Sequence, residues 1–440
     1  MAYDLILRGG TVVNQDGAGV RDVGVIGDRI AAIGLAEGAD AGEVVDCTGL
    51  HVLPGVIDTQ VHFREPGATH KEDLAAGARG AVLGGVTAVF EMPNTNPLTT
   101  DEGAVEDKLR RARGMMCDHA FYVGATTENT HHLPELERLP GICGVKVFMG
   151  ASTGDLLISD DEGVLAVLEN GHRRVAFHSE DEFMLRDNAG LAREGDWTSH
   201  PEVRSVEAAV SSTTRLMRLA RQARRRVHVL HVSTADEVPI LADNRDIATC
   251  EVTPQHLTLT APDAYRRLKG RAQMNPPIRE PRHAAGLWSA LNLGLFDVAG
   301  SDHAPHTLEE KAKPYPQSPS GMPGVQTLLP VMLTHVAEGR LSLARLVDLT
   351  SAGAQRVFGT AGKGRLAVGY DADFTVVDLN RTHTIADAEM ANLSGWTPFD
   401  GFEAKGWPVG TIIRGRRVMW EGELIGEPGG EPVRFMETLT

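Results

Sequence analysis

Short runs of alternating apolar and polar residues, punctuated by glycine, open the chain. Alternation with a period of two predicts strands that bury one face. We expect such strands at Leu5–Leu7, Thr11–Val13, Val23–Ile26 and Ile30–Ile33. The same pattern returns near the end of the chain, at Phe374–Val377, Thr411–Arg414 and Arg417–Trp420. Because chain termini often lie close together, residues 1–51 and 363–440 are predicted to form one small β-sandwich domain.

The middle of the chain alternates apolar, β-branched runs with amphipathic segments of helical period. The apolar runs predict eight buried strands, at Val56–His62, Val86–Glu91, His119–Gly124, Val145–Met149, Arg174–His178, Val227–His231, Ile247–Val252 and Phe296–Gly300. Helices are predicted between several of them, at Lys71–Leu83, Asp101–Arg113, Glu202–Arg224 and Pro281–Leu291. Eight alternating units are typical of a (β/α)8 TIM-type barrel, which we place in residues 52–362. The Pro-, Ser- and Gly-rich segment Lys311–Pro323 is predicted to be a loop after the eighth strand.

Composition narrows the range of partners. The 440 residues suffice for one barrel and a smaller domain. Lys and Arg number 43 against 59 Asp and Glu, so the formal net charge is −16. An acidic surface argues against nucleic acid and against anionic membranes as partners. It does not exclude a small anionic substrate, because a binding site can hold its own local cations.

Cysteine usage and the first residues predict a cytoplasmic protein. Cys47, Cys117, Cys143 and Cys250 are widely spaced and form no CxxC pair, which favours reduced thiols over a disulfide frame. Residues 1–10 lack a basic region followed by a long apolar run, so we expect no signal peptide. No run approaches the roughly 20 apolar residues that a transmembrane helix needs.

Metal-ligand and ionisable side chains gather where the predicted strands end. Barrel enzymes carry their catalytic groups at the carboxyl ends of the strands. Those positions here hold Gln60, His62, Asn94, Lys146, His178, His231 and Asp302. One histidine at such a place is more often a satisfied polar residue than a ligand. Three histidines, a lysine and an aspartate at corresponding places predict a metal site, with Zn²⁺ the best match and Mn²⁺, Co²⁺ or Fe²⁺ as alternatives.

Two of these positions leave alternatives open. Gln60 and His62 share one face of their strand, and Asp58 lies on the same face one step deeper. Asp58 either orients a ligand or satisfies buried backbone groups. Lys146 ends an apolar strand, where a buried ammonium beside metal ions would be costly. Addition of CO₂ would turn it into an anionic bridging ligand. Alternatively, the lysine reaches out to solvent or pairs with a substrate anion.

Several long motifs resemble those of the dihydroorotases in the amidohydrolase superfamily. They span essentially the whole chain and lie at 54–67 (PGVIDTQVHFREPG), 91–95 (EMPNT), 275–279 (NPPIR), 302–306 (DHAPH) and 321–325 (GMPGV). The resemblance implies reversible hydrolysis of the cyclic amide of dihydroorotate to N-carbamoyl-L-aspartate, a step of pyrimidine biosynthesis. It also implies a homo-oligomer, dimer or tetramer, and leaves open an association with aspartate transcarbamoylase.

The resemblance also implies roles for the predicted site residues. His62 would bind a buried (alpha) zinc, and His178 and His231 an exposed (beta) zinc. Carboxylated Lys146 would bridge the two metals, and Asp302 would contact the alpha metal and carry a proton. The family's substrate-binding positions are Arg64, Asn94 and His306, which grip the substrate carboxylate, and Asn275, which lies near the ring. An arginine suits that task because its guanidinium binds a carboxylate through two parallel hydrogen bonds.

The chain departs from the family pattern at two glutamines. The usual motif is HxH, and Gln60 replaces its first histidine. An amide oxygen is a poorer zinc ligand than imidazole, so we expect one or two zinc ions, with the beta site more secure than the alpha site. Gln255 stands where many relatives have histidine, and the sequence assigns that change no consequence.

Two other functions compete with dihydroorotase. Allantoinases and hydantoinases have similar metal machinery, and Lys146–Met149 resembles the hydantoinase form, but those relatives lack the Arg64–Asn94 pair. A non-catalytic subunit that partners aspartate transcarbamoylase is supported only by Gln60. Among the remaining histidines, His228 is expected to be structural, His131, His132 and His172 exposed, and His303 is left unassigned.

Overall fold

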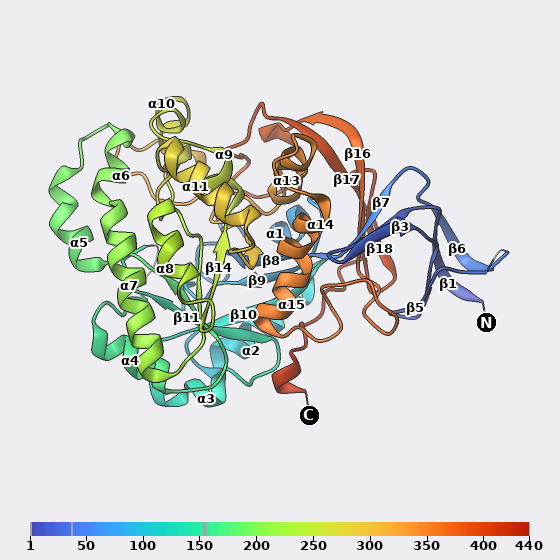
Figure 1. Ribbon diagram of the computed structural model, residues 1–440, viewed down its shortest axis with the longest axis horizontal. Helices are drawn as coiled ribbons and strands as arrows, with labels where there is room; N and C mark the ends of the chain where they lie inside the picture. Colours follow the sequence, from blue (N-terminus) through green and yellow to red (C-terminus); the bar gives the residue numbers. More distant parts are fainter. Residues whose placement is uncertain (1, 37, 153–155, 440) are drawn as a thin grey trace.

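A computed structural model describes all residues except 1, 37, 153–155 and 440. Its centre is a parallel eight-stranded sheet in which neighbouring strands follow chain order (Figure 1). The strands are β8 (Val56–Val61), β9 (Val86–Glu91), β10 (Asp118–Gly124), β11 (Ile142–Phe148), β12 (Val175–His178), β13 (Val227–Val229), β14 (Ala248–Val252) and β15 (Val298–Ala299). The His62 amide donates to the His303 carbonyl at 2.6 Å and nearly closes the sheet into a barrel. The predicted TIM-type barrel is therefore confirmed.

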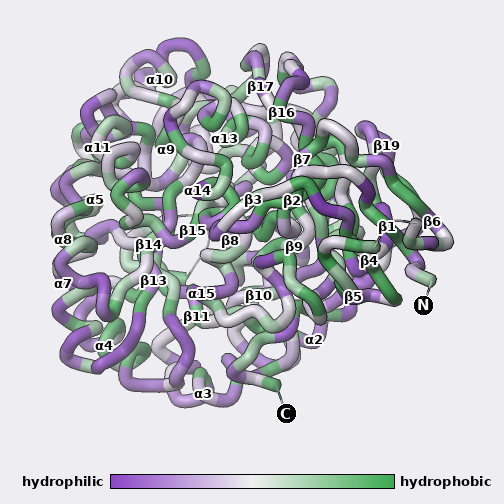
Figure 2. The backbone as a smooth tube through the Cα atoms, turned by 45° about the vertical axis from the view of Figure 1, so that its right-hand side comes forward, coloured by the Kyte–Doolittle hydropathy of each residue, from purple (hydrophilic) through white to green (hydrophobic). Residues whose placement is uncertain are grey.

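Helices surround the barrel strands. The longer ones are α1 (Leu74–Leu83), α2 (Glu102–Arg111), α4 (Asp161–Glu169), α7 (Val206–Ala223), α11 (Pro281–Asn292) and α13 (Leu328–Ala337). Shorter ones are α3 (Leu133–Leu136), α5 (Glu182–Asp187), α8 (Val238–Ala242), α9 (Pro254–Thr258), α10 (Asp263–Leu268), α12 (Leu308–Lys311), α14 (Leu343–Val347) and α15 (Gly353–Phe358). Hydrophilic segments lie mainly at the outer margin, as on α7 and α10 in Figure 2. In α7 the buried residues recur at helical spacing, for example Ala209, Ser212 and Leu216, so one face packs against the barrel.

One predicted helix is two helices. The segment Glu202–Arg224 contains the end of α6 (His200–Val203) and all of α7. Arg204 leaves the helical conformation with φ −100° and ψ 70°, and the Ser205 hydroxyl caps α7 by accepting from the Ala208 amide. The Arg279 guanidinium donates to the carbonyls of Arg204 at 3.0 Å and Ser205 at 3.3 Å. The break depends on this long-range contact, which hydrophobic periodicity does not reveal.

Strands from both chain ends form two further sheets. The seven-stranded sheet runs in the order β19-β18-β17-β16-β7-β2-β3, and the four-stranded sheet in the order β5-β4-β1-β6. The first-half strands are β1 (Tyr3–Arg8), β2 (Thr11–Asn14), β3 (Gly17–Val20), β4 (Val23–Ile26), β5 (Arg29–Ile33), β6 (Ala41–Asp46) and β7 (His51–Pro54). The second-half strands are β16 (Phe374–Thr384), β17 (Glu403–Ile413), β18 (Arg416–Trp420) and β19 (Glu423–Leu424). A shared core that includes Leu5, Val52 and Phe374 joins the two sheets.

The segment after β19 returns to the barrel. Pro432 pairs with His119 at the start of β10, and the Phe435 ring contacts Phe90 edge-on at 5.9 Å between centroids. This tail therefore lies at the end of the barrel where the strands begin (Figure 1, red). The four cysteines are free and buried. No helix in the described part of the chain is long and apolar enough to cross a membrane.

Candidate active site

The predicted site residues meet at the carboxyl end of the barrel. One hollow is lined by Gln60, His62, Arg64, Asn94, His178, His231, Asn275 and Asp302, together with Phe148, Ser152, Ala304, Ser320 and Gly321. Lys146 lies beside it, with Nζ 4.3 Å from the centroid of the Phe148 ring. His306 contacts Arg64 at the rim. The predicted site residues, which are separated by up to 246 positions from Gln60 to His306, therefore converge on one place.

Backbone strain marks three of these residues. Arg64, His231 and Asp302 have φ values of 62°, 35° and 45°, in the left-handed region that residues other than glycine rarely adopt. Each follows shortly after a barrel strand. Such a conformation costs about 1–2 kcal/mol per residue. Strained conformations of this kind are typical of functional sites, where the orientation of a side chain matters more than local stability.

His178 and His231 are arranged as a pair of ligands. His178 Nδ1 lies 3.1 Å from His231 Nε2. Two nitrogens bound tetrahedrally to one zinc at about 2.0–2.1 Å would be separated by roughly 3.3 Å. Burial lowers the pKa of both rings, so both are neutral, which is the form that binds metal.

A carboxylate behind His178 fixes its orientation. His178 Nε2 lies 2.8 Å from Glu180 Oε2, so this nitrogen carries the proton and Nδ1 is left as the donor of a lone pair. Arg204 Nε donates to the same carboxylate oxygen at 3.0 Å. The cation of Arg204 compensates the buried charge of Glu180 and helps to hold the pKa of that carboxyl well below its usual range. Sequence reasoning missed both residues, although the His-x-Glu spacing places Glu180 on the same face as His178.

Lys146 is buried without a hydrogen-bond partner for its amine among the described residues. Its side chain is 1% exposed, and Nζ has no hydrogen-bond partner among the described residues. Burial lowers its pKa to about 7, so a large share of the amine is neutral near neutral pH. The neutral amine is the form that adds CO₂. The alternative of a lysine that reaches out to solvent is wrong, because the ammonium position is enclosed.

His62, Asp302 and Gln60 form the other half of the centre. His62 Nδ1 lies 2.8 Å from Asn94 Oδ1, so it donates there, and His62 Nε2 faces Asp302 Oδ1 at 3.2 Å. Two lone-pair donors at this separation need a cation or a proton between them. Gln60 Nε2 donates to the same Asp302 oxygen at 2.9 Å, while Gln60 Oε1 has no hydrogen-bond partner in the described structure. The nitrogen end of the amide, not the oxygen, is therefore turned toward Asp302.

Arg64 and His306 lie side by side at the rim of the hollow. Arg64 is 5% exposed, and its Nε donates to the Pro305 carbonyl at 3.1 Å. Its Nη2 lies 3.3 Å from His306 Nε2. Burial lowers the pKa of Arg64 to about 10, which leaves it charged at neutral pH. A buried guanidinium at the mouth of a cavity is suited to an anionic group of a ligand.

Asp58 satisfies buried backbone groups and does not face the metal residues. Its Oδ1 accepts from the amides of Ser301 at 3.0 Å and Gln60 at 3.2 Å. Asp58 thus ties the end of the first barrel strand to the end of the eighth. Of the two alternatives that the sequence left open, the structure supports the backbone role.

His303 and Gln255 also have structural positions. His303 Nδ1 accepts from the amides of Gly324 at 3.1 Å and Val325 at 3.3 Å, so the ring is held away from Asp302 and is not a ligand. Gln255 Nε2 donates to the Ser301 carbonyl at 2.7 Å. Gln255 therefore holds the segment that carries Asp302. His228 is buried against Thr249 at 2.8 Å, as expected for a structural histidine.

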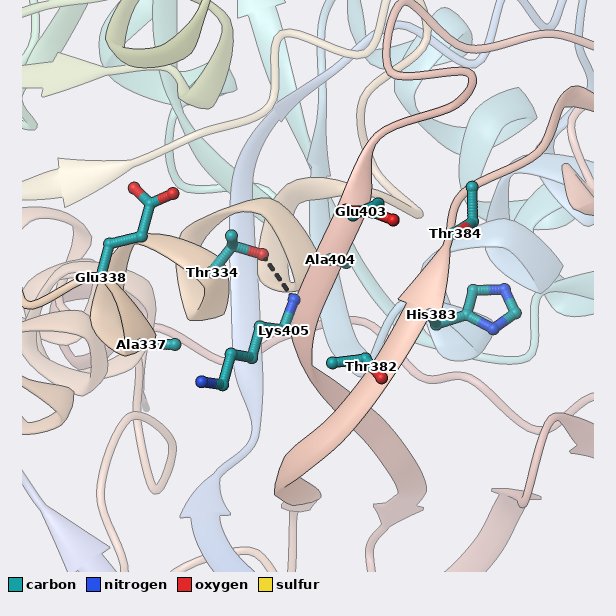
Figure 3. A pocket seen from close by; sticks show the side chains of 9 residues that line it. All are labelled: Thr334, Ala337, Glu338, Thr382, His383, Thr384, Glu403, Ala404 and Lys405. Atoms are coloured by element: carbon teal, nitrogen blue, oxygen red, sulfur yellow. Dashed lines mark hydrogen bonds between the residues drawn. The ribbon is translucent and has the colours of Figure 1, made fainter.

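A second, larger hollow of about 470 Å³ lies between α13 and the β16–β17 pair (Figure 3). Thr334, Glu338, His383, Glu403 and Lys405 are among the residues that line it. The Lys405 amide donates to the Thr334 hydroxyl at 2.9 Å. The charged side chains of Glu338 and Lys405 diverge in Figure 3, and none of the predicted site residues is present. The convergent chemistry is therefore at the barrel mouth.

A profile of the amidohydrolase family matches residues 51–418. The chain belongs to the amidohydrolase family. This amidohydrolase is 37% identical over 401 residues to the dihydroorotase of Methanosarcina acetivorans, across 88% of this chain and 85% of that protein. It is 35% identical over 447 residues to the allantoinase of Rubrobacter xylanophilus, across 98% of each. The solved L-hydantoinase of Arthrobacter aurescens superposes with a TM-score of 0.93 at 29% identity, across 98% of this chain and all of that one. The protein is therefore a hydrolase, and its family resemblance is confirmed.

Proposed function

We propose that this amidohydrolase is a dihydroorotase. The observation that carries the proposal is the buried guanidinium of Arg64 beside His306, at the rim of the hollow that holds the metal-ligand residues. A cyclic amide that bears a carboxylate would be held there with its ring over His62, His178 and Asp302. The cyclic ureides of the alternative functions offer no carboxylate for this cation.

We propose zinc as the metal, with carboxylated Lys146 as a shared ligand. In the described part of the chain, no group of three His, Cys, Asp or Glu side chains is close enough together to hold a metal ion without a further ligand. His178 and His231 supply two nitrogens, so a third ligand has to come from another residue type. CO₂ added to Lys146 Nζ, with loss of one proton, gives a carbamate whose oxygens fill that place. The reaction would also replace a buried amine that has no hydrogen-bond partner among the described residues.

In ring opening, the residues of the site then have different roles. The metal, when bound, lowers the pKa of water and polarises the ring carbonyl. Asp302 takes the proton of the attacking water at Oδ1 and delivers it to the leaving ring nitrogen. Arg64 and His306 hold the substrate carboxylate, so the scissile bond stays aligned during the transfer. Glu180 and Arg204 keep His178 oriented without touching the substrate.

Substrate assays on one purified, metal-analysed sample test the function. We expect turnover of dihydroorotate and zinc bound to the same sample, with little turnover of allantoin or of an unsubstituted hydantoin. Faster turnover of allantoin or hydantoin than of dihydroorotate would replace the proposal with one of the alternative functions. Zinc binding without turnover of any of them would favour a non-catalytic subunit.

The Arg64→Met variant tests the carboxylate grip. Loss of a charged hydrogen bond to the substrate costs about 1.5–3 kcal/mol, so kcat/KM for dihydroorotate should fall at least 10- to 100-fold. Zinc content should stay at the native value, because Arg64 is not a ligand. Steady-state kinetics and metal analysis check both. An Arg64→Met enzyme with native kcat/KM would remove the main reason for preferring dihydroorotase.

A further inference from the structure

Lys71 contacts His306, the histidine that we propose for binding the substrate carboxylate. It does so at Nδ1, whereas Arg64 lies at Nε2. Lys71 Nζ lies 3.1 Å from His306 Nδ1 and 3.0 Å from Glu310 Oε1. Its side chain is 16% exposed, and none of the functions argued above uses it. Lys71 and His306 are 235 positions apart in the chain, so only the fold brings them together.

The contact determines which nitrogen of His306 carries the proton. An ammonium group has donors and no lone pair, so His306 Nδ1 must accept from Lys71. His306 Nε2 then carries the proton, and it lies 3.0 Å from the Ser320 carbonyl. Arg64 Nη2 is also a donor, so its 3.3 Å approach to Nε2 is not a hydrogen bond. The Nε2–H of His306 is thus directed at the Ser320 carbonyl, and Arg64 Nη2 finds no acceptor on the ring, as binding of a substrate carboxylate by Arg64 requires.

Without Lys71 the opposite tautomer has a partner ready. Glu310 Oε2 lies 3.7 Å from His306 Nδ1 and could accept a proton from it after a small shift. His306 Nε2 would then become an acceptor, and Arg64 Nη2 would donate to it. Arg64 would be bonded within the protein, and the ring nitrogen would present a lone pair to the substrate carboxylate.

We propose that Lys71 is a positioning residue for substrate binding, which holds His306 in the tautomer whose Nε2–H donates to the Ser320 carbonyl, so that Arg64 Nη2 is not bonded to the ring and stays available to the substrate carboxylate. This inference rests on the proposed dihydroorotase function. It assigns Lys71 no contact with the reacting bond. The effect belongs to binding of the carboxylate and not to metal loading or to proton transfer at Asp302.

Binding of orotate and turnover of dihydroorotate test the role of Lys71 in the zinc-loaded enzyme. In Lys71→Met, the Kd of orotate and the KM of dihydroorotate should both rise on the order of 10- to 100-fold. The kcat value and the zinc content should change little. Lys71→Arg keeps a charged donor at this place and should stay close to the native values. His70→Gln is the matched control, because His70 is exposed, lies beside Glu310 and does not contact His306.

A double variant separates the tautomer from simple loss of charge. Lys71→Met combined with Glu310→Gln lacks both the lysine and the carboxylate that would capture the Nδ1 proton. Part of the lost orotate affinity should return in it, although the site has not regained the cation of Lys71. No recovery would overturn the tautomer explanation, and native affinity in Lys71→Met would overturn the role of Lys71 altogether. A native enzyme that neither binds orotate nor hydrolyses dihydroorotate would instead overturn the proposed function, and this inference with it.

Discussion

Gln60 replaces the first histidine of the HxH pattern and contacts the carboxylate of Asp302. Its Nε2 donates to Asp302 Oδ1 at 2.9 Å, and its Oε1 is buried without a partner in the described structure. The position near His62 therefore has one imidazole, whereas the position between His178 and His231 has two. Unequal metal affinities follow from this difference, because imidazole is a stronger donor to zinc than an amide.

Zinc titration of the metal-free protein checks this expectation. The native chain should bind one zinc tightly and a second one weakly or not at all. Gln60→His should raise occupancy of the second site. Gln222→His is the matched control, since Gln222 is exposed on α7, does not line the hollow and should not alter occupancy. Two equally tight sites in the native protein would show that Gln60 is an adequate ligand.

Lys146 is the residue that we propose as the shared metal ligand. If it carries the bridging carboxylate, Lys146→Ala should lose zinc and activity together, because the remaining ligands are too few. Added acetate or another short carboxylate should restore part of both, since it can occupy the vacated space. Lys146→Arg should fail in the same way, because a guanidinium does not add CO₂. Metal analysis of each variant, with and without acetate, is the measurement, and full zinc content in Lys146→Ala would contradict the proposal.

At the scale of elements, the break between α6 and α7 supports the centre. Arg204 leaves the helical path and reaches Glu180, which orients His178. A continuous helix would carry its side chain away from that carboxylate. The sequence favours the longer helix, and the tertiary contacts of Arg279 with the Arg204 and Ser205 carbonyls favour the break.

Substitutions at the neighbouring residues Arg204 and Ser205 separate the support of His178 from the capping of α7. Arg204→Gln leaves the buried Glu180 charge uncompensated and should weaken zinc binding about 10- to 100-fold. Ser205→Ala removes the N-cap of α7 and should lower the free energy of unfolding by about 1 kcal/mol without changing zinc affinity. Zinc titration and chemical denaturation of both variants provide the comparison. Equal zinc affinities in the two would refute a role for Arg204 behind His178.

At the scale of the whole molecule, a buried ion cluster joins the barrel to the β-rich ends. Lys363 Nζ lies 2.6 Å from Asp118 Oδ2 at the start of β10 and 3.1 Å from Asp371 Oδ2, and it also binds Asp373. Arg414, the residue after β17, also forms an ion pair with Asp118. Nearby carboxylates raise the pKa of Lys363, so it is charged across the range in which the protein is expected to work. The cluster is closed only when both parts are folded together.

Removing the central cation should therefore destabilise the whole chain. Lys363→Met removes the cation that three carboxylates share and leaves buried Asp373 without an ion pair among the described residues, so the free energy of unfolding should fall by about 3–5 kcal/mol. Arg365→Met is the matched control. Its ion pair with Asp16 is exposed and should contribute less than about 1 kcal/mol. Thermal and chemical unfolding of the two variants give the measurement. A Lys363→Met protein as stable as Arg365→Met would show that the cluster does not hold the two parts together.

Local patterns determined the barrel and the composition of its mouth. All eight predicted barrel strands are present, and their ends are shifted by up to three residues. They could be predicted because buried strands consist of apolar, β-branched runs. Strand β9 coincides with its predicted range. The sequence predicted which side chains meet at the mouth, because barrel enzymes carry their catalytic groups where strands end, a position that can be read along the chain. The short strands β3, β6, β7 and β19 were missed, since two to six residues with weak alternation carry little signal.

Only the tertiary structure decided how the side chains of the mouth are used. Which end of the Gln60 amide faces Asp302 and which nitrogen of His306 carries a proton depend on partners more than 200 positions away. The break before α7 and the return of Phe435 to the barrel depend on contacts of the same kind. Periodicity and strand ends are properties of neighbouring residues, so a sequence displays them directly. Hydrogen-bond direction, tautomer and charge compensation are set by groups that meet only after the chain has folded.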